Sequence, residues 1–223
     1  MQKINSFGDA LWADGVQIDP ADGVNFSGRF ASNNLGGFDI FWERGVYPNV
    51  DILFKRFGSS GSPLTNDPIN VAVGDGYQFA PNIISGSGDS VFVVFADQST
   101  GSIDLRVQYF QGNDPLMQDN GILAQKGLDG DIKYNNAFFN QNQDITLFWE
   151  DNRASKKIYS NRLSDNAFSH FNGNQVSFSD NSSTEIDLSG PSIAFSSNAL
   201  YAATFDATGT PKKIRINKMD LNL

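Results

Sequence analysis

The chain has 223 residues, of which 16 are Lys or Arg and 25 are Asp or Glu, giving a formal net charge of −9. This acidic balance argues against nucleic acid and anionic membranes as partners, and the absence of Cys excludes disulfides, thiol nucleophiles and Cys-ligated metals. No run of residues approaches the roughly 18 apolar residues of a membrane span, so membrane insertion is not expected, and a secretion signal would have to lie outside this chain.

In chain order, the first strand signal is LWADGVQI, within residues 10–19. A group of four short runs follows, rich in Val, Ile, Phe, Tyr and Trp and separated by Gly, Ser, Asn and Asp: GRFASNN, FDIFWERG, DILFKRF and PLTNDPINVAV. Such runs and separators are typical of strands and turns, and no amphipathic helix pattern interrupts them.

This group of four recurs along the chain. One series of apolar runs ends in a large aromatic residue, at successive spacings of 53, 54 and 56 positions: Trp42, Phe95, Trp149 and Phe205. A second series keeps nearly the same spacing of 53, 53 and 56 residues, namely Ile52, Leu105, Ile158 and Ile214. Four strands repeated about every fifty residues predict an all-β fold, a β-propeller of four blades with four antiparallel strands each.

The repeats place the units at about 28–73, 79–125, 133–179 and 189–223, within a single domain of residues 1–223. The last unit ends without room for an outer strand. Residues 10–19 align with the outer strands of the other units, since Leu11 and Leu64 are 53 residues apart. We therefore expect the N-terminal strand to complete the last blade and close the ring, which removes exposed sheet edges.

The apolar runs VFVVF and DITLFW do not alternate with polar residues, which predicts strands buried on both sides between neighbouring blades. On this interpretation Trp42, Phe95, Trp149 and Phe205 form blade-to-blade core and are not a sugar-stacking platform.

The segment FWEDNRASKKIYSNRL, residues 148–163, is similar to the W-x-D-x-R...IY-x-x-R-[IL] repeat of secreted bacterial β-propellers related in architecture to sialidase-like domains. The run LWADGVQI resembles the outer strand that follows in such repeats. The likeness weakens in the second unit, which lacks the Arg, and in the fourth, which lacks the Trp. The resemblance implies the propeller fold and a scaffold role in an exported protein, secreted or at the cell surface.

The sequence assigns no catalytic residue. The single His170 is expected at the surface, so a Ser-His-Asp system or a His-rich metal site has little to build on. Arginines that could hold an acidic substrate recur at equivalent positions, Arg44 with Arg153 and Arg56 with Arg162, as structural repeats do. The charged turn of Asp151 and Arg153 is likewise expected to stabilise a turn.

Strand direction alternates in a blade, so the turn from second to third strand lies on the same face as the link from an outer strand to the next inner strand. The links near the channel carry carboxylates and the turns carry cations. This mouth face supplies the candidate ligand-binding residues Asp22, Asp75, Asp129, Asp131, Glu185, Asp187, Arg44 and Arg153. Carboxylates in this arrangement could bind calcium or a polyhydroxylated sugar, or serve only as turn residues that keep the domain soluble.

We therefore expect a non-enzymatic extracellular recognition, adhesion or scaffold domain, excised from a larger secreted or surface protein, whose partner is a glycan or another surface protein. No cofactor is expected apart from the calcium considered above. The alternative is a carbohydrate-active enzyme of propeller fold, a glycoside hydrolase or a sialidase-like enzyme, because glycoside hydrolysis needs only a pair of carboxylates.

Overall fold

The computed structural model describes residues 1–19, 23–86, 88–126, 132–139, 145–151, 157–163, 176–177, 186–196, 199–206 and 213–220. Every regular element in these ranges is a β-strand in an antiparallel sheet, which confirms the all-β expectation. The same ranges contain no helix that is long and apolar enough to cross a membrane.

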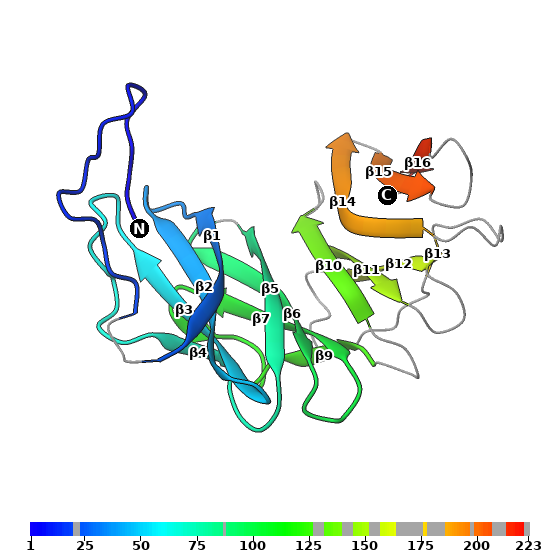
Figure 1. The fold of residues 1–223 in the computed structure, drawn as a ribbon, viewed down its shortest axis with the longest axis horizontal. Coiled ribbons are helices and arrows are strands. Elements are labelled where there is room, and N and C mark those ends of the chain that lie inside the picture. The colour runs from blue at the N-terminus through cyan, green and yellow to red at the C-terminus, as the bar shows by residue number, and fades with distance from the viewer. Residues whose placement is uncertain are drawn as a thin grey trace. The chain divides into compact units, whose positions relative to one another are not determined.

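The strands form four sheets in chain order (Figure 1). The first sheet contains β1 (Asn25–Ser32), β2 (Phe38–Val46), β3 (Asn49–Phe57) and β4 (Ile69–Ala72). The second contains β5 (Gln78–Ser85), β6 (Ser90–Asp97), β7 (Asp104–Gln111) and β8 (Asp114–Pro115), with β9 (Ile122–Gln125) also paired to β7. The third contains β10 (Ile132–Phe139), β11 (Ile145–Asp151), β12 (Lys157–Leu163) and β13 (Val176–Ser177). The fourth contains β14 (Ile186–Ser196), β15 (Ala199–Asp206) and β16 (Lys213–Asp220).

The chain divides into two compact units. The first unit comprises Met1–Val93 and Val107–Ile122 and includes the whole of the first sheet. The second comprises Val94–Arg106 and Leu123–Leu223 and includes the third and fourth sheets. The features described below as a candidate site all lie in the first unit.

Backbone irregularities recur with the sequence period. The first strands of three sheets carry register shifts, between Phe26 and Arg29, between Lys133 and Asn135, and between Asp187 and Ser192. In the first sheet the shift coincides with a left-handed backbone at Ser27 (φ 52°), and Ala80 on β5, 53 residues later, has the same backbone conformation (φ 54°). The register shifts in these three sheets are β-bulges, which bend a strand locally.

The predicted core aromatics are buried where their side chains are described. Trp42 is 4% exposed, Phe95 is fully buried and Trp149 is 1% exposed, which confirms their assignment to the core. All eight residues of β6 are buried, as its unbroken apolar pattern predicted. Phe205 lies on β15, where the structure describes the backbone.

The N-terminal segment differs from the expected strand. Residues 11–19 form no strand, because the backbone around them pairs with the first residues of the chain: Leu11 N–H donates to Lys3 O (2.8 Å), and Met1 and Val16 exchange two bonds of 2.8 Å. Val16 and Ile18 then pack on an apolar cluster of the first sheet, formed by Ile40, Trp42, Leu53 and Phe57.

The pairing inside this segment repeats that of the outer parts of the first two sheets. Antiparallel bridges join Ile4 to Ala10, Phe57 to Pro63, and Phe110 to Pro115. The Leu11 N–H bond to Lys3 O is matched by Leu64 N–H to Arg56 O (2.9 Å) and by Leu116 N–H to Tyr109 O (2.8 Å). Residues 1–19 therefore adopt the local structure of a third strand end and its outer connection.

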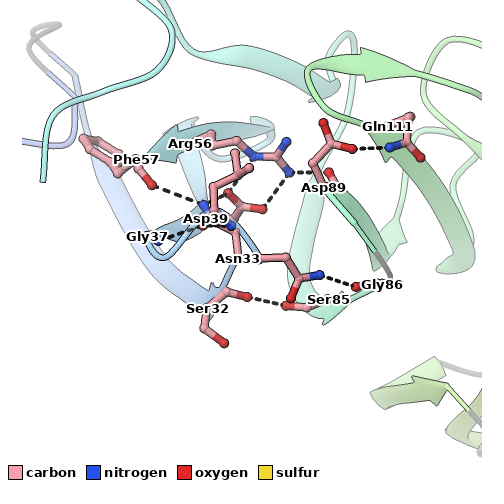
Figure 2. A network of polar contacts seen from close by, with 12 residues as sticks. Ser32, Asn33, Gly37, Asp39, Arg56, Phe57, Ser85, Gly86, Asp89 and Gln111 are labelled. Atoms are coloured by element: carbon pink, nitrogen blue, oxygen red, sulfur yellow. Dashed lines mark hydrogen bonds and ion pairs between the residues drawn. The ribbon is translucent and has the colours of Figure 1, made fainter. Parts of the chain in front are cut away.

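A buried ion pair holds the first sheet together at the start of β2. Arg56 on β3 binds Asp39 on β2 through two hydrogen bonds of 2.8 Å, and both side chains are 3% exposed. Asn33 donates to Asp39 Oδ1 (2.9 Å) and to Phe57 O (3.2 Å), so the carboxylate is closely surrounded by donors (Figure 2). Charge-assisted bidentate pairs of this kind fix geometry strongly.

The same network reaches the turn between β5 and β6. Arg56 donates to Asp89 O (2.9 Å), Asn34 donates to Gly86 O (3.0 Å), and the Ser85 hydroxyl donates to Ser32 O (2.7 Å) (Figure 2). Arg56 thus has a structural role: its guanidinium joins two strands of one sheet and a turn of the next.

Replacing Arg56 by Met should lower the free energy of unfolding by about 3–5 kcal/mol, because it leaves the Asp39 carboxylate buried without its partner. The double variant Asp39→Asn/Arg56→Met should recover part of that loss, since no charge is then stranded. Urea denaturation measures both.

Arg44→Met is the matched control, because Arg44 is 33% exposed and its pair with Asp19 is long (3.5 Å). We expect it to lower the free energy of unfolding by about 1 kcal/mol or less. Equal losses for Arg56→Met and Arg44→Met would contradict the role of the buried pair.

Candidate functional site

Two loops of the first unit lie side by side at the end of β2. They are the β2–β3 turn, residues 46–49, and the β4–β5 link, residues 73–77. Val50 N–H donates to Gly76 O (3.1 Å), Gly76 N–H to Asn49 Oδ1 (3.3 Å) and Gly74 N–H to Asp51 Oδ1 (3.1 Å). The turn and the link, which we expected on one face, therefore lie together in the first unit, and we call the surface that they form the mouth face.

Of the predicted ligand-binding residues, the structure describes the side chains of two, Arg44 and Asp75. Asp75 is exposed in the β4–β5 link, whereas Arg44 is half-buried and pairs with Asp19 (3.5 Å). Asp187 pairs with Phe205 in the backbone ladder of β14 and β15. The remaining predicted residues lie outside the described residues, namely Asp22, Asp129, Asp131, Glu185 and Arg153. His170 also lies outside them.

Beneath the mouth face, Glu43 carries a buried carboxyl that is 2% exposed. Its Oε1 accepts the N–H of Ala80 on β5 (2.9 Å). Burial raises the pKa of Glu43 above its ordinary value of 4.5, although the hydrogen bonds from Ala80 and the Ser27 side chain and the positive charge of Arg29 act in the opposite direction. Glu43 thus links β2 to the first strand of the next sheet, a structural role.

Three aromatic rings lie on the same two loops and the start of β5. Tyr47, 70% exposed, meets Tyr77 edge to face with centroids 5.6 Å apart, and Tyr77 stacks on Phe79 with centroids 4.3 Å apart. Burial, and then the negative charges of Glu43 and Tyr47, raise the pKa of Tyr77 above its ordinary value of 10.0. We call Tyr47, Tyr77 and Phe79 the aromatic corner.

The sequence interpretation missed the aromatic corner because it followed features that recur. Tyr47 stands five residues after Trp42, and the corresponding positions of the later units hold Thr100, Ala154 and Thr210. Tyr77 immediately precedes β5, and the positions preceding the other first strands hold Val24, Asp131 and Glu185. The departure of both tyrosines from the repeat was the available signal.

Metal binding gains no support from the part of the chain that the structure describes. No group of three or more His, Cys, Asp or Glu side chains there is arranged to hold a metal ion. Asp51 and Asn49, which flank the mouth face, use their side-chain oxygens to accept backbone N–H groups of the β4–β5 link.

No protein family model matches the sequence, and no curated protein matches it. Among solved structures, the fold is similar to an endo-arabinase from Bacteroides thetaiotaomicron VPI-5482, with 9% identity and a TM-score of 0.49 over 85% of this chain and 73% of that one. It is also similar to the polysaccharide lyase Uly1, with 8% identity and a TM-score of 0.45 over 87% of this chain and 58% of that one. At these values neither likeness bears on activity or substrate.

The pKa of Glu43 predicts a pH dependence of stability. Because the pKa is raised in the folded state, the protonated carboxyl stabilises the fold below about pH 4.5, and this contribution is lost as the pH rises through the folded pKa. Glu43→Gln keeps an oxygen acceptor for Ala80 N–H and does not titrate. The free energy of unfolding of the variant should therefore match the parent near pH 4 and exceed it increasingly toward pH 7. Denaturant titrations at several pH values measure this difference. If the free energies of unfolding of the variant and the parent change in parallel with pH, the prediction is wrong, because folding then leaves the pKa of Glu43 unchanged.

Proposed function

We propose that the chain is a non-enzymatic recognition domain of β-propeller architecture, which binds a glycan on its mouth face and works outside the cell or at its surface. The observation that carries the proposal is the locking of the β2–β3 turn to the β4–β5 link by three hydrogen bonds. A binding surface held in advance loses little conformational entropy when a ligand arrives. Asp75 and Tyr47 are exposed on that rigid surface.

The chemistry of this face favours binding over catalysis. Its buried carboxyl, Glu43, is 2% exposed and accepts a backbone N–H. Asp19, a second carboxylate nearby, accepts Trp42 Nε1–H (3.3 Å) and pairs with Arg44. Side chains already engaged in holding the fold are poorly suited to act on a substrate, whereas exposed rings and acceptors suit recognition.

A four-bladed ring closed by the N-terminal segment is the architecture that we propose for this domain, as in the secreted β-propellers that the repeats resemble. Residues 1–19 already have the local structure of a third strand end and outer connection. Through Val16 and Ile18 they pack on residues of β2 and β3 in the first sheet, while Phe30 on β1 remains 71% exposed. The fourth sheet contains three strands among the described residues and would gain its outer strand by this closure.

Ring closure predicts a compact particle in solution. A closed domain of this length should have a radius of gyration of about 17 Å, from the scaling for compact domains. Small-angle X-ray scattering of the full chain measures it. A monomer with a radius of gyration well above about 20 Å would contradict closure, because a ring without exposed blade faces cannot be that extended.

A carbohydrate-active enzyme is the second candidate function, and one observation favours it. Burial and then the charge of Glu43 raise the pKa of Tyr77, so a carboxyl with a raised pKa lies electrostatically close to a phenol, a pairing that can serve proton transfer. The burial of Glu43 argues against direct contact with a substrate.

Binding without turnover is the expected outcome for the recognition domain. The full chain should retain oligosaccharides on a glycan array, and incubation with aryl glycosides, sialosides and plant and bacterial polysaccharides should release no product above the buffer rate. Robust turnover that Glu43→Gln removes, in a variant that melts no lower than the parent, would replace our proposal by the enzymatic one.

A further inference from the structure

We propose that the aromatic corner, together with Asp75, forms a subsite for a pyranose ring of a neutral glycan. The inference rests on the proposed glycan-recognition function and names the residues and the ligand class within it.

The position of the corner in the repeat is the first argument. Features that hold the fold recur, as the left-handed backbones at Ser27 and Ala80 and the repeated outer bridges do. Tyr47 and Tyr77 do not recur, since the equivalent positions of the other units hold small, polar or aliphatic residues. An exposed aromatic side chain that the repeat does not require is a candidate for ligand contact.

The geometry supplies the second argument. Tyr47 is 70% exposed and stands at 84° to the ring of Tyr77, so the two rings form an angled wall. Tyr77 is held by stacking on Phe79, whose ring lies at 14° to it. A pyranose offers an apolar C–H face to such a ring and hydroxyl groups around its edge, and sugar-sized ligands are held by aromatic contacts with a few well-placed polar groups.

The polar groups beside the corner favour a neutral sugar. The exposed carboxylate of Asp75, two residues before Tyr77, can accept hydrogen bonds from hydroxyl groups. Of the nearby cations, Arg44 already pairs with Asp19. The net charge of −9 also repels a polyanionic glycan over distance. The corner therefore offers acceptors for hydroxyls and little attraction for uronates or sialosides.

The test is isothermal titration of the full chain with hexasaccharides of the cello, xylo, manno and laminari series, and with oligogalacturonate and sialyllactose as acidic probes. We expect a neutral hexasaccharide to bind, and Tyr47→Ala to weaken that binding about tenfold or more. Tyr47→Phe, which keeps the ring, should have an affinity within about threefold of the parent's.

Asp75→Ala should weaken binding more than Asp75→Asn, which retains an acceptor. Leu116→Ala, at a residue 56% exposed away from the mouth face, is the matched control and should leave binding unchanged.

Three results would overturn the inference. If a neutral hexasaccharide binds the parent and Tyr47→Ala equally, the subsite lies elsewhere while the recognition function stands. If only the acidic probes bind, the ligand class is wrong. If no glycan binds the parent, the proposed glycan recognition fails and the subsite fails with it. Melting curves of all variants separate loss of binding from loss of fold.

Discussion

The buried pair of Asp39 and Arg56 is the constraint on which the first unit depends. Two charges that are 3% exposed are stable only if their geometry is fixed, so the pair sets the register of β2 against β3. Arg56 also binds the carbonyl of Asp89, which ties that register to the β5–β6 turn. Because β2 pairs with β3 without a register shift from Phe38 to Val46, the order imposed at Asp39 extends to Glu43 and to the turn that carries Tyr47.

The two ends of β2 thus have different chemical roles. At its start the polar groups are buried and satisfied by one another, with Asn33 completing the coordination of Asp39. At its end Glu43 binds the backbone of β5, and the loops beside it are joined by hydrogen bonds, two of them to the side chains of Asn49 and Asp51, that leave Tyr47 and Asp75 exposed. A rigid base beneath an exposed surface is the arrangement that recognition requires.

The sequence predicted the strands, their period and the burial of Trp42, Phe95 and Trp149, because close packing of repeated sheets places strong demands on side-chain type. It did not predict that Asp39 and Arg56 face each other, since that depends on the cross-strand register of β2 and β3, which the period of the apolar runs does not specify. Residues 10–19 were expected as a strand of the last blade. The structure instead pairs their start with residues 1–4, a choice between two local partners that the pattern alone does not decide.

The recurring carboxylates drew the sequence interpretation toward the mouth face, while the tyrosines on it were overlooked because they break the repeat. The most direct test of the division between a structural and a recognition end is a nuclear magnetic resonance titration of the labelled chain with the neutral hexasaccharide that binds most tightly. We predict that amide shift changes concentrate in residues 45–50 and 73–79. Changes concentrated instead at Asn33–Gly37 and around Asp89 would contradict the account, because they would place the ligand on the network that holds the fold.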